Sequence, residues 1–382
     1  MSLHKVIMAA SEPPSGQSET NEINDYPLHI PSTGALLDAV VRANALATLT
    51  PHLPVSLPLY RRLQFGRFFE ATTLLTNLSL ANQELRQPDP LTTPDQGEGE
   101  PWLIAFVDRS CRPETEVWLF CSWEAGPDTV NGSLPENGKE EDLIRRLLVA
   151  MKALRIPESI HQDILNARAT ELEDSSVDSA GLSRSHYASH MLDPNIMLWG
   201  ATHERTVPLL QRLGVAAGEF KAAATPNLMF TWDTNALAPQ KDLPEGVIWG
   251  ELKQRHFKLV RSRTQIPRLY RTLAVLPSLG IFPDVPHPSQ AHPDPVAWVF
   301  VGLDGSLTTL HVEPEYRGKG LAKAITTKLF REKMGLFWEE GLTRWAHGYV
   351  IRGNKESEGM CRSLNGLSDW DVYWIRVDLG AV

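Results

Sequence analysis

The residues from Arg317 to Gly320, in the order Arg-Gly-Lys-Gly, place two cations and two glycines where a strand turns into a helix. The preceding run, 306–312, is rich in β-branched and apolar residues and is typical of a strand. The following run carries Leu321, Ile325 and Leu329 at helical spacing. Backbone N–H groups are free at a helix N-terminus, and the helix dipole favours negative charge there. The arrangement predicts a site for a phosphate or pyrophosphate, with a plain tight turn as the alternative.

The composition favours a globular protein. The chain has 382 residues, enough for two domains, and 42% of them are apolar. A net charge of −9 argues against a nucleic-acid-binding protein, which needs a basic face. No apolar run approaches the roughly 18–20 residues that span a bilayer, and the N-terminal segment is too short in apolar residues for a signal peptide. We therefore expect a cytoplasmic protein that binds neither nucleic acid nor a membrane.

The three cysteines form no CxxC pair and are too few for a disulfide framework, so we expect no metal site and free thiols. Polar stretches at 1–27, 86–101 and 169–189 are expected to be loose. Apolar runs at 102–108 and 116–124 predict a strand pair, and 140–154 predicts a helix with acids in its first turn.

The last part of the chain alternates strand and helix patterns. Strands are expected at 246–252, 344–351 and 369–379, a short helix at 354–364, and a helical segment at 254–276 that is broken near Pro267. Asp304-Gly305 joins two apolar runs and predicts a type I′ hairpin turn, which needs positive φ. A boundary between two halves is expected near Asp242.

This order of elements resembles the acyl-CoA-binding core of the GNAT acyltransferase superfamily over about Ile248 to Leu379. Residues 317–322 match its R-x-x-G-x-G/A pattern, and Asn354 and Ser357 match its N-x-x-S/A pattern after the next strand. The run "PVAWVF...DGSLTTLHVEPEYRGKGL" is most similar to the glycine N-acyltransferase-like branch, whose members contain two GNAT-like halves.

The resemblance implies an α/β fold (α+β, with a mixed sheet) made of two GNAT-like halves. We expect a flexible tail over 1–27, a degenerate GNAT-like half over 28–241, and a C-terminal GNAT acyltransferase domain over 242–382. Only the C-terminal half is expected to bind acyl-CoA.

The resemblance also implies how the co-substrate is held. Backbone amides of 317–322 would hold the pyrophosphate of acetyl-CoA or another acyl-CoA, because glycines admit close approach. Unpaired backbone groups of 310–312 would hold the pantetheine arm, and an N–H near Val312 would stabilise the oxyanion as an amine attacks the thioester. The implied cofactor-binding residues are Leu310, His311, Val312, Arg317, Gly318, Lys319, Gly320, Leu321, Ala322, Asn354 and Ser357.

The sequence departs from the family where a general base is expected. The family often has Glu or His at the positions of Ser306 and Thr308, so a water held by these hydroxyls, or a carboxylate elsewhere, must take the proton. If the strand is regular, Leu310 shares their face, and His311 lies opposite and is packed rather than catalytic. Asp304 is expected to serve only its turn, and Glu313 to be exposed.

A second departure concerns the general acid. Cys361 stands where many members have the Tyr that protonates the leaving thiolate. A thiol of ordinary pKa can donate a proton to another thiolate. The alternative is an inert residue that packs as a small apolar side chain.

An acid-free segment from Gln254 to Pro283 suggests the acceptor. Arginine forks bind carboxylates well, so Arg261, Arg263 and Arg268 are candidates to bind a substrate carboxylate, with a solvated surface patch as the alternative. The leading hypothesis is an N-acyltransferase that uses acyl-CoA, with acetyl foremost, and acts on a small amine such as an amino acid. The alternatives are a protein or peptide N-acetyltransferase and a non-catalytic, regulatory acyl-CoA-binding protein.

Overall fold

The computed structural model describes residues 39–68, 71–78, 80, 100–125, 138–158, 193–216, 225–264, 268–284 and 293–382. Of the segments expected to be loose, 1–27, 169–189 and nearly all of 86–101 lie outside these residues.

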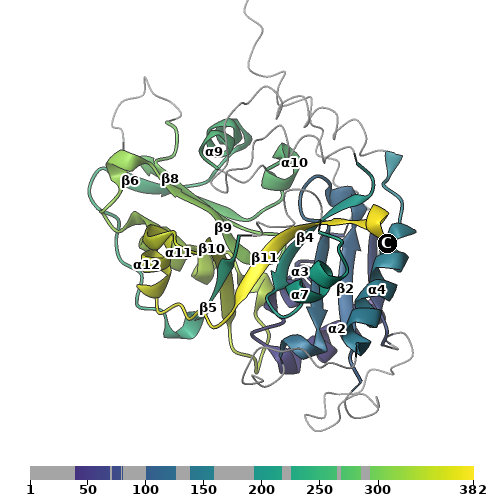
Figure 1. Ribbon diagram of the computed structural model, residues 1–382. Helices are drawn as coiled ribbons and strands as arrows, with labels where there is room; N and C mark the ends of the chain where they lie inside the picture. Colours follow the sequence, from purple (N-terminus) through teal and green to yellow (C-terminus); the bar gives the residue numbers. More distant parts are fainter. Residues whose placement is uncertain are drawn as a thin grey trace, which may run out of the picture.

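One 11-stranded mixed sheet runs through the molecule in the order β1-β2-β3-β4-β11-β5-β10-β9-β8-β7-β6 (Figure 1). The first five strands in sequence are β1 Thr72–Thr76, β2 Leu103–Asp108, β3 Val117–Cys121, β4 Ile196–His203 and β5 Asn227–Asp233. The other six are β6 Val247–Gly250, β7 Ser278–Pro283, β8 Ala297–Val301, β9 Ser306–Val312, β10 Trp345–Ile351 and β11 Asp371–Asp378.

Both halves of the sheet repeat one strand pattern. Antiparallel β1, β2 and β3 lead to β4, which runs parallel to β3, and antiparallel β6, β7, β8 and β9 lead to β10, which runs parallel to β9. Each parallel pair is short: Val117 and Trp118 pair with Trp199 and Gly200, whereas Ser306 and Leu307 pair with His347 and Gly348. Beyond these pairs the strands separate. The repeat confirms the predicted fold of two GNAT-like halves.

The two halves exchange their last strands. β5, from the first half, pairs with β10 from Asn227 opposite Ile351 to Asp233 opposite Trp345. β11, the last strand of the chain, pairs with β4 from Ile196 opposite Asp378 to His203 opposite Val372. Figure 1 shows β11, in yellow, crossing to the side of β4. Each half therefore completes the sheet of the other.

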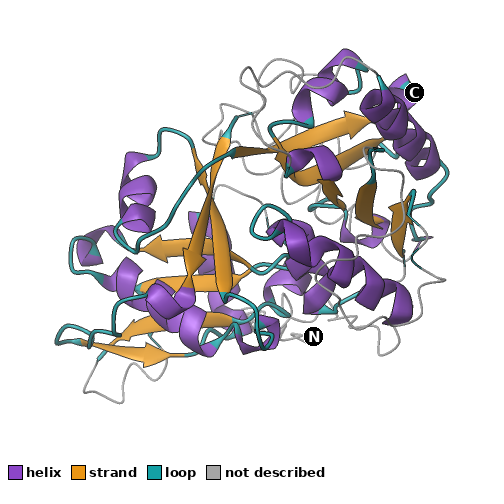
Figure 2. Ribbon diagram, turned by 90° about the horizontal axis from the view of Figure 1, so that it is seen from below, coloured by secondary structure: helices purple, strands orange, loops and turns teal. Residues whose placement is uncertain are grey.

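Helices cover both faces of the sheet, and the strands of the two halves form two groups (Figure 2). Side chains of one strand alternate between the faces, as β8 shows: Trp298 and Phe300 pack with the helices before β7, whereas Val299 and Val301 pack with the helix after β9. The face called the α9 face carries α2 Ala39–Leu49, α3 Leu57–Phe65, α9 Phe257–Arg263 and α10 Tyr270–Leu273. The α11 face carries α4 Lys139–Lys152, α7 Val207–Arg212, α11 Leu321–Glu332 and α12 Lys355–Arg362.

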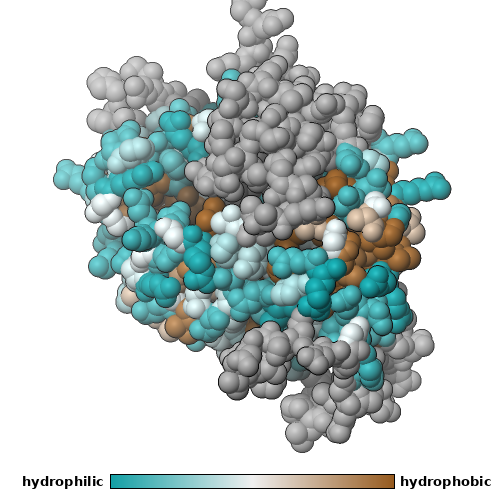
Figure 3. Space-filling model, viewed as in Figure 1, coloured by the Kyte–Doolittle hydropathy of each residue, from teal (hydrophilic) through white to brown (hydrophobic). Residues whose placement is uncertain are grey.

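Short 3-10 helices complete the described elements: η1 Thr50–His52, η2 Arg109–Cys111, η3 Ser122–Glu124, η5 Thr234–Ala236, η6 Gln254–His256, η7 Pro314–Tyr316, η8 Gly335–Phe337 and η9 Leu379–Ala381. Most of the described surface seen in Figure 3 is hydrophilic, and apolar residues gather near α4 and the C-terminus. Val149 on α4 is 57% exposed. No helix in the described ranges has the length and apolar character needed to cross a membrane.

The local predictions for the last part of the chain are confirmed by β6, β8 to β11, α11 and α12. The predicted type I′ turn is wrong. Gly305 has φ +74°, but Asp304 does not adopt positive φ. The loop spans Gly302–Gly305 and is closed by a hydrogen bond from the Gly302 N–H to the Ser306 carbonyl, which lets the Asp304 side chain turn inward.

Candidate active site

The strand β9 contains a bulge that changes which side chains share a face. Thr308 lies opposite Phe300 and His311 lies opposite Trp298, so two residues of β9 oppose Val299 alone. Thr309, at the bulge, has φ +55°, which is unusual for a β-branched residue. Trp298 and Phe300 both face α9, and the facing residues of β9 must do the same.

The expectation that Leu310 shares the face of Ser306 and Thr308 is therefore wrong, as is the expectation that His311 lies opposite. Leu310 and Val312 pack on the α11 face, whereas the His311 ring stacks on Trp298. Burial lowers the pKa of His311, although Glu313 opposes this change. Glu313 is also not exposed as expected: its side chain is 13% accessible and pairs with Arg263 at 3.0 Å.

The splay between β9 and β10 begins after Leu307, where the pairing of the two strands ends. The N–H of Glu313 donates to the carbonyl of Val296 beside β8. Because N–H directions alternate along a strand, the N–H of Val312 points away from β8 and into the splay. The Val312 carbonyl, on the same side, accepts from Arg317 Nε at 3.0 Å. Backbone polar groups thus line this gap on the β9 side.

The glycine loop lies between β9 and α11. Gly318 and Gly320 have φ +74° and +79°, and a Cβ added to either would meet no atom within 4 Å. Arg317 and Lys319 are exposed, Leu321 is buried, and Ala322 is half-buried at the start of the helix. The 12-residue helix presents free N–H groups at this end. Two cations, open space and helix amides together fit a bound pyrophosphate.

The residues predicted on α12 have structural contacts. Asn354 is the N-cap of α12, and its Oδ1 accepts from the Ser357 N–H at 3.1 Å. Cys361 is 2% exposed and packs in the apolar core between α11, α12 and the sheet. Burial raises the pKa of Cys361 to about 12, against the opposing charge of Arg362. The structure therefore favours the alternative in which Cys361 packs as an apolar residue.

A buried polar cluster lies at the closed end of the splay, on the α9 face. Ser306 Oγ donates to Asp304 Oδ1 at 2.7 Å, and Tyr349 Oη donates to Asp304 Oδ2 at 2.8 Å. His347 Nε2 lies 3.5 Å from Asp304 Oδ2 and 3.1 Å from Tyr349 Oη. Burial raises the pKa of Asp304, but His347, Ser306 and Tyr349 together outweigh it and hold that pKa below its ordinary value.

The sequence analysis missed this cluster. Asp304 is 3% exposed and does more than serve its turn. Its partners come from β10, two residues apart, and reach it because Ser306 pairs with His347. Two polar residues at alternate positions of an apolar strand were the signal available in the sequence.

The three candidate acceptor arginines contact different partners. Arg263 is held by Glu313, and the guanidinium of Arg261 lies 4.8 Å from the centre of the Tyr270 ring. Arg268 Nη2 instead donates to Thr308 Oγ1 at 3.1 Å, and its buried Nε has no hydrogen-bond partner among the described residues. Arg268 is therefore the arginine that reaches β9 beside the splay.

The corresponding splay in the first half is filled by side chains. Trp123 Nε1 donates to Thr206 Oγ1 at 3.2 Å, and Thr206 donates to Glu124 at 2.5 Å. Arg205 donates to the carbonyls of Trp123 and Glu124, which closes the gap between the ends of β3 and β4. The helix α4 that follows has three acids in its first turn, where a phosphate would be repelled.

The short parallel strand pair, its splay and the glycine loop at a helix N-terminus define a GNAT-type acyltransferase. The sequence profile of the acyl-CoA N-acyltransferase verG N-terminal domain matches residues 38–229. The chain therefore belongs to this family of acyl-CoA N-acyltransferases, whose members transfer acyl groups from acyl-CoA.

Three solved structures are similar to the chain. A Drosophila protein has a TM-score of 0.53 and 14% identity, over 90% of this chain and 97% of its own. A tandem GNAT protein from the clavulanic acid biosynthesis pathway has a TM-score of 0.39 and 13% identity, over 91% and 97% of the two chains. A GCN5-related N-acetyltransferase from Sphaerobacter thermophilus has a TM-score of 0.38 and 11% identity, over 73% and 81%. Of these three, the Drosophila protein shows a shared fold. No curated protein matches the chain.

Proposed function

We propose that the protein transfers an acyl group, acetyl foremost, from acyl-CoA to a small amine that also carries a carboxylate, such as an amino acid. The observation that carries this proposal is the splay of β9 from β10 beside a loop with two cations and two open, left-handed glycines. Within the chain, the domain over 242–382 would bind both substrates, and the half over 28–241 would bind no acyl-CoA because its own splay is filled.

Acyl-CoA supplies the thioester that the amine attacks. Backbone amides of 317–322, with Arg317 and Lys319, would hold its pyrophosphate, and backbone groups of 310–312 would hold the pantetheine arm. The Val312 N–H points into the splay and is placed to donate to an oxygen that gains negative charge. Asn354 and Ser357 would contribute by fixing the start of α12. Among the residues that the structure describes, no group of His, Cys, Asp or Glu is arranged to hold a metal ion.

The proton of the attacking amine would leave through Ser306. Ser306 lies two residues before Thr308 on the same face of β9, and its hydroxyl donates to Asp304. The amine proton would pass to Ser306 Oγ as the Ser306 proton passes to Asp304, while the new C–N bond forms and the C–S bond breaks. Coenzyme A then leaves as the thiolate, which takes a proton from water, and Asp304 returns its proton to the solvent. Asp304 is thus the carboxylate that replaces the missing Glu or His.

The acceptor carboxylate would bind Arg268. This guanidinium has a buried nitrogen without a described partner, beside the hydroxyl of Thr308 at the splay. A bound carboxylate satisfies such a group and adds a charge-assisted hydrogen bond. An amino-acid acceptor also accords with the glycine N-acyltransferase-like branch, which stays a prediction.

The test is thiol release from acetyl-CoA with a panel of free amino acids, their amides, polyamines and peptides, followed by mass spectrometry of the products. We expect N-acylated amino acids. Acylation of peptides alone would identify a peptide N-acetyltransferase. Tight acetyl-CoA binding without thiol release from any amine would identify a binding protein without turnover.

A further inference from the structure

The turn between β2 and β3, in the first half, contacts the helix that follows Arg268. Glu114 Oε1 accepts from the backbone N–H of Leu269 at 3.1 Å, and Glu114 Oε2 accepts from the hydroxyl of Thr272. Leu269 is the N-cap of α10, and Arg268 directly precedes it. The carboxylate of Glu114, which is 8% exposed, therefore holds the start of α10 from the other half of the protein.

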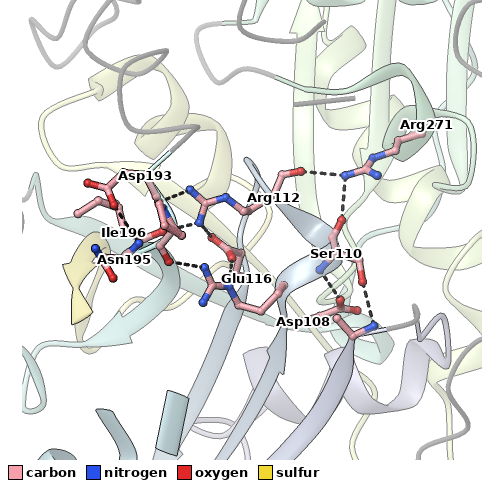
Figure 4. A network of polar contacts seen from close by, with 11 residues as sticks. Asp108, Ser110, Arg112, Glu116, Asp193, Asn195, Ile196 and Arg271 are labelled. Atoms are coloured by element: carbon pink, nitrogen blue, oxygen red, sulfur yellow. Dashed lines mark hydrogen bonds and ion pairs between the residues drawn. The ribbon is translucent and has the colours of Figure 1, made fainter. Parts of the chain in front are cut away.

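A second contact fixes the same helix. Arg271 Nη2 donates to the carbonyls of Ser110 and Arg112 at 2.9 Å and 2.8 Å, and Figure 4 shows Arg271 pointing at both residues. The turn 110–116 is thus joined to α10 by two separate sets of hydrogen bonds, one from Glu114 and one to Arg271.

The turn is itself held firmly within the first half. Arg112 donates to the carbonyls of Asp193 and Ile196, each at 2.6 Å, and pairs with Glu116 at 3.3 Å. Arg109 pairs with the other Glu116 oxygen at 2.9 Å, and all three side chains are buried. A turn fixed by two buried guanidinium groups is a rigid support for what it contacts.

We infer that the first half serves acyl transfer as the support for the acceptor-binding arginine: Glu114 and Arg271 hold α10 so that Arg268 lies against Thr308. The inference rests on the proposed function of Arg268. Glu114 and Arg271 are positioning residues, since they act through Arg268. The half that binds no acyl-CoA would then set the affinity for the amine.

Glu114 can position Arg268 because the residue that Glu114 holds is the next one along the chain. The Leu269 N–H that Glu114 holds belongs to the peptide unit joined to Arg268, so a shift at Leu269 moves Arg268 with it. Without Glu114, that N–H and the Thr272 hydroxyl lose their buried acceptor, and α10 relaxes toward other partners. A displacement of about 1 Å in a positioning group is enough to change rates markedly.

The experiment compares Glu114→Gln and the milder Thr272→Val with the wild type. Glu124→Gln is the matched control, because Glu124 is also a buried acid of the first half but bonds Thr206 within that half. We expect the KM for the acceptor to rise about tenfold in Glu114→Gln, as for loss of one charge-assisted hydrogen bond, and by a smaller factor in Thr272→Val. The Kd for acetyl-CoA and the acceptor KM of the control should stay within about twofold of the wild type.

A double-mutant cycle tests the route through Arg268. On an Arg268→Met background, Glu114→Gln should raise the acceptor KM little further, because the group that it positions is gone. Additive effects, or an unchanged KM in Glu114→Gln, would overturn the inference.

Hydrogen exchange supplies a readout that needs no activity. In Glu114→Gln, the amides of 269–273 should exchange faster than in the wild type, and those of α11 should not. Unchanged exchange in α10 would also overturn the inference. If the wild type transferred no acyl group, the proposed function would be refuted. The hydrogen-exchange result would still test whether Glu114 holds α10 in place.

Discussion

Arg268 and Thr308 meet across the gap between α10 and β9, where Arg268 Nη2 donates to Thr308 Oγ1 at 3.1 Å. The arginine follows the undescribed residues 265–267, and the threonine is the last residue of β9 before the bulge. Their contact brings a cation to the edge of the splay on the face that carries Ser306. In the proposed function, an acceptor bound there would have its carboxylate at Arg268 and its amine near β9.

Arg268→Met should abolish discrimination between an amino acid and its amide. Loss of a charge-assisted contact typically costs about 1.5–3 kcal/mol, or roughly 10- to 150-fold in kcat/KM. The amide, which cannot make that contact, should react at a similar rate with both enzymes. The control is Arg263→Met, because Arg263 is half-exposed and paired with Glu313. If the wild type acylated an amino acid and its amide at equal rates, the proposal that Arg268 binds an acceptor carboxylate would be wrong.

Gly320→Val should weaken acetyl-CoA binding about tenfold or more, which is about 1.4 kcal/mol. The valine side chain would enter space that is open beside the helix N-terminus. Gly341→Val is a closely matched control, since Gly341 has φ +80° and equally open surroundings but lies away from the loop. Calorimetry on both folded variants separates backbone strain, which they share, from occlusion of the pyrophosphate site. An equal loss of affinity in both would contradict the site.

Asp304→Asn should lower kcat by roughly 100-fold or more, as expected for loss of a general base, without changing acetyl-CoA affinity. Ser306→Ala should reproduce much of the loss, because it breaks the link to Asp304. Asp233→Asn is the control, since Asp233 likewise accepts a backbone N–H two residues later but lies outside the cluster.

The pH dependence gives a further check on Asp304. Its pKa lies below the ordinary 3.8, so the carboxylate is ionised above about pH 4. The substitution should therefore lower the rate evenly across pH 5 to 9 and leave the acid limb, set by the amine, in place. If the acid limb of the pH–rate profile shifted in Asp304→Asn, that limb would report the titration of Asp304. The depressed pKa of Asp304 would then be wrong.

Cys361→Ala should leave kcat unchanged and lower the free energy of unfolding by about 1 kcal/mol through lost packing. A thiol whose pKa burial raises to about 12 is a poor proton donor at neutral pH. Saturating kinetics and a denaturant titration measure both quantities. A large fall in kcat with unchanged acetyl-CoA affinity would restore Cys361 as the acid.

Glu124 should make the protein less stable as pH rises from about 4.5 to 7. Burial raises the pKa of Glu124 to about 7 from 4.5, against weaker effects of Thr206 and Arg205. The folded state then holds a proton that the unfolded state has released, so the stabilisation is full below pH 4.5 and lost through pH 7. The change amounts to at most about 3 kcal/mol. Unfolding titrations of Glu124→Gln should show a shallower slope than the wild type, and an equal slope would contradict the shift.

The sequence predicted the parts of the site that depend on neighbours along the chain. The glycines, cations and periodicity around Gly320 are local signals, and the strand, loop and helix form where they indicate. The residues of the proposed acyl-CoA site could therefore be predicted from the sequence.

What the sequence did not predict depends on pairing between distant strands. The bulge at Thr309 carries no Gly or Asn and arises from register with β8. Asp304 meets Tyr349 because β9 and β10 run parallel, and Glu114 meets Leu269 across the two halves. The exchange of β5 and β11 has the same origin, since either strand pattern fits either half of the sheet.

That exchange also fixes when the protein can finish folding during synthesis. β4 is made about halfway through the chain, but its partner β11 is the last of the described strands to be made. Until β11 has left the ribosome, β4 has an open edge that can pair with other chains. Pairing over such a sequence distance is slow to form. A truncation that removes β11 would therefore leave open edges on both of its neighbours, a long one on β4 and a shorter one on β5.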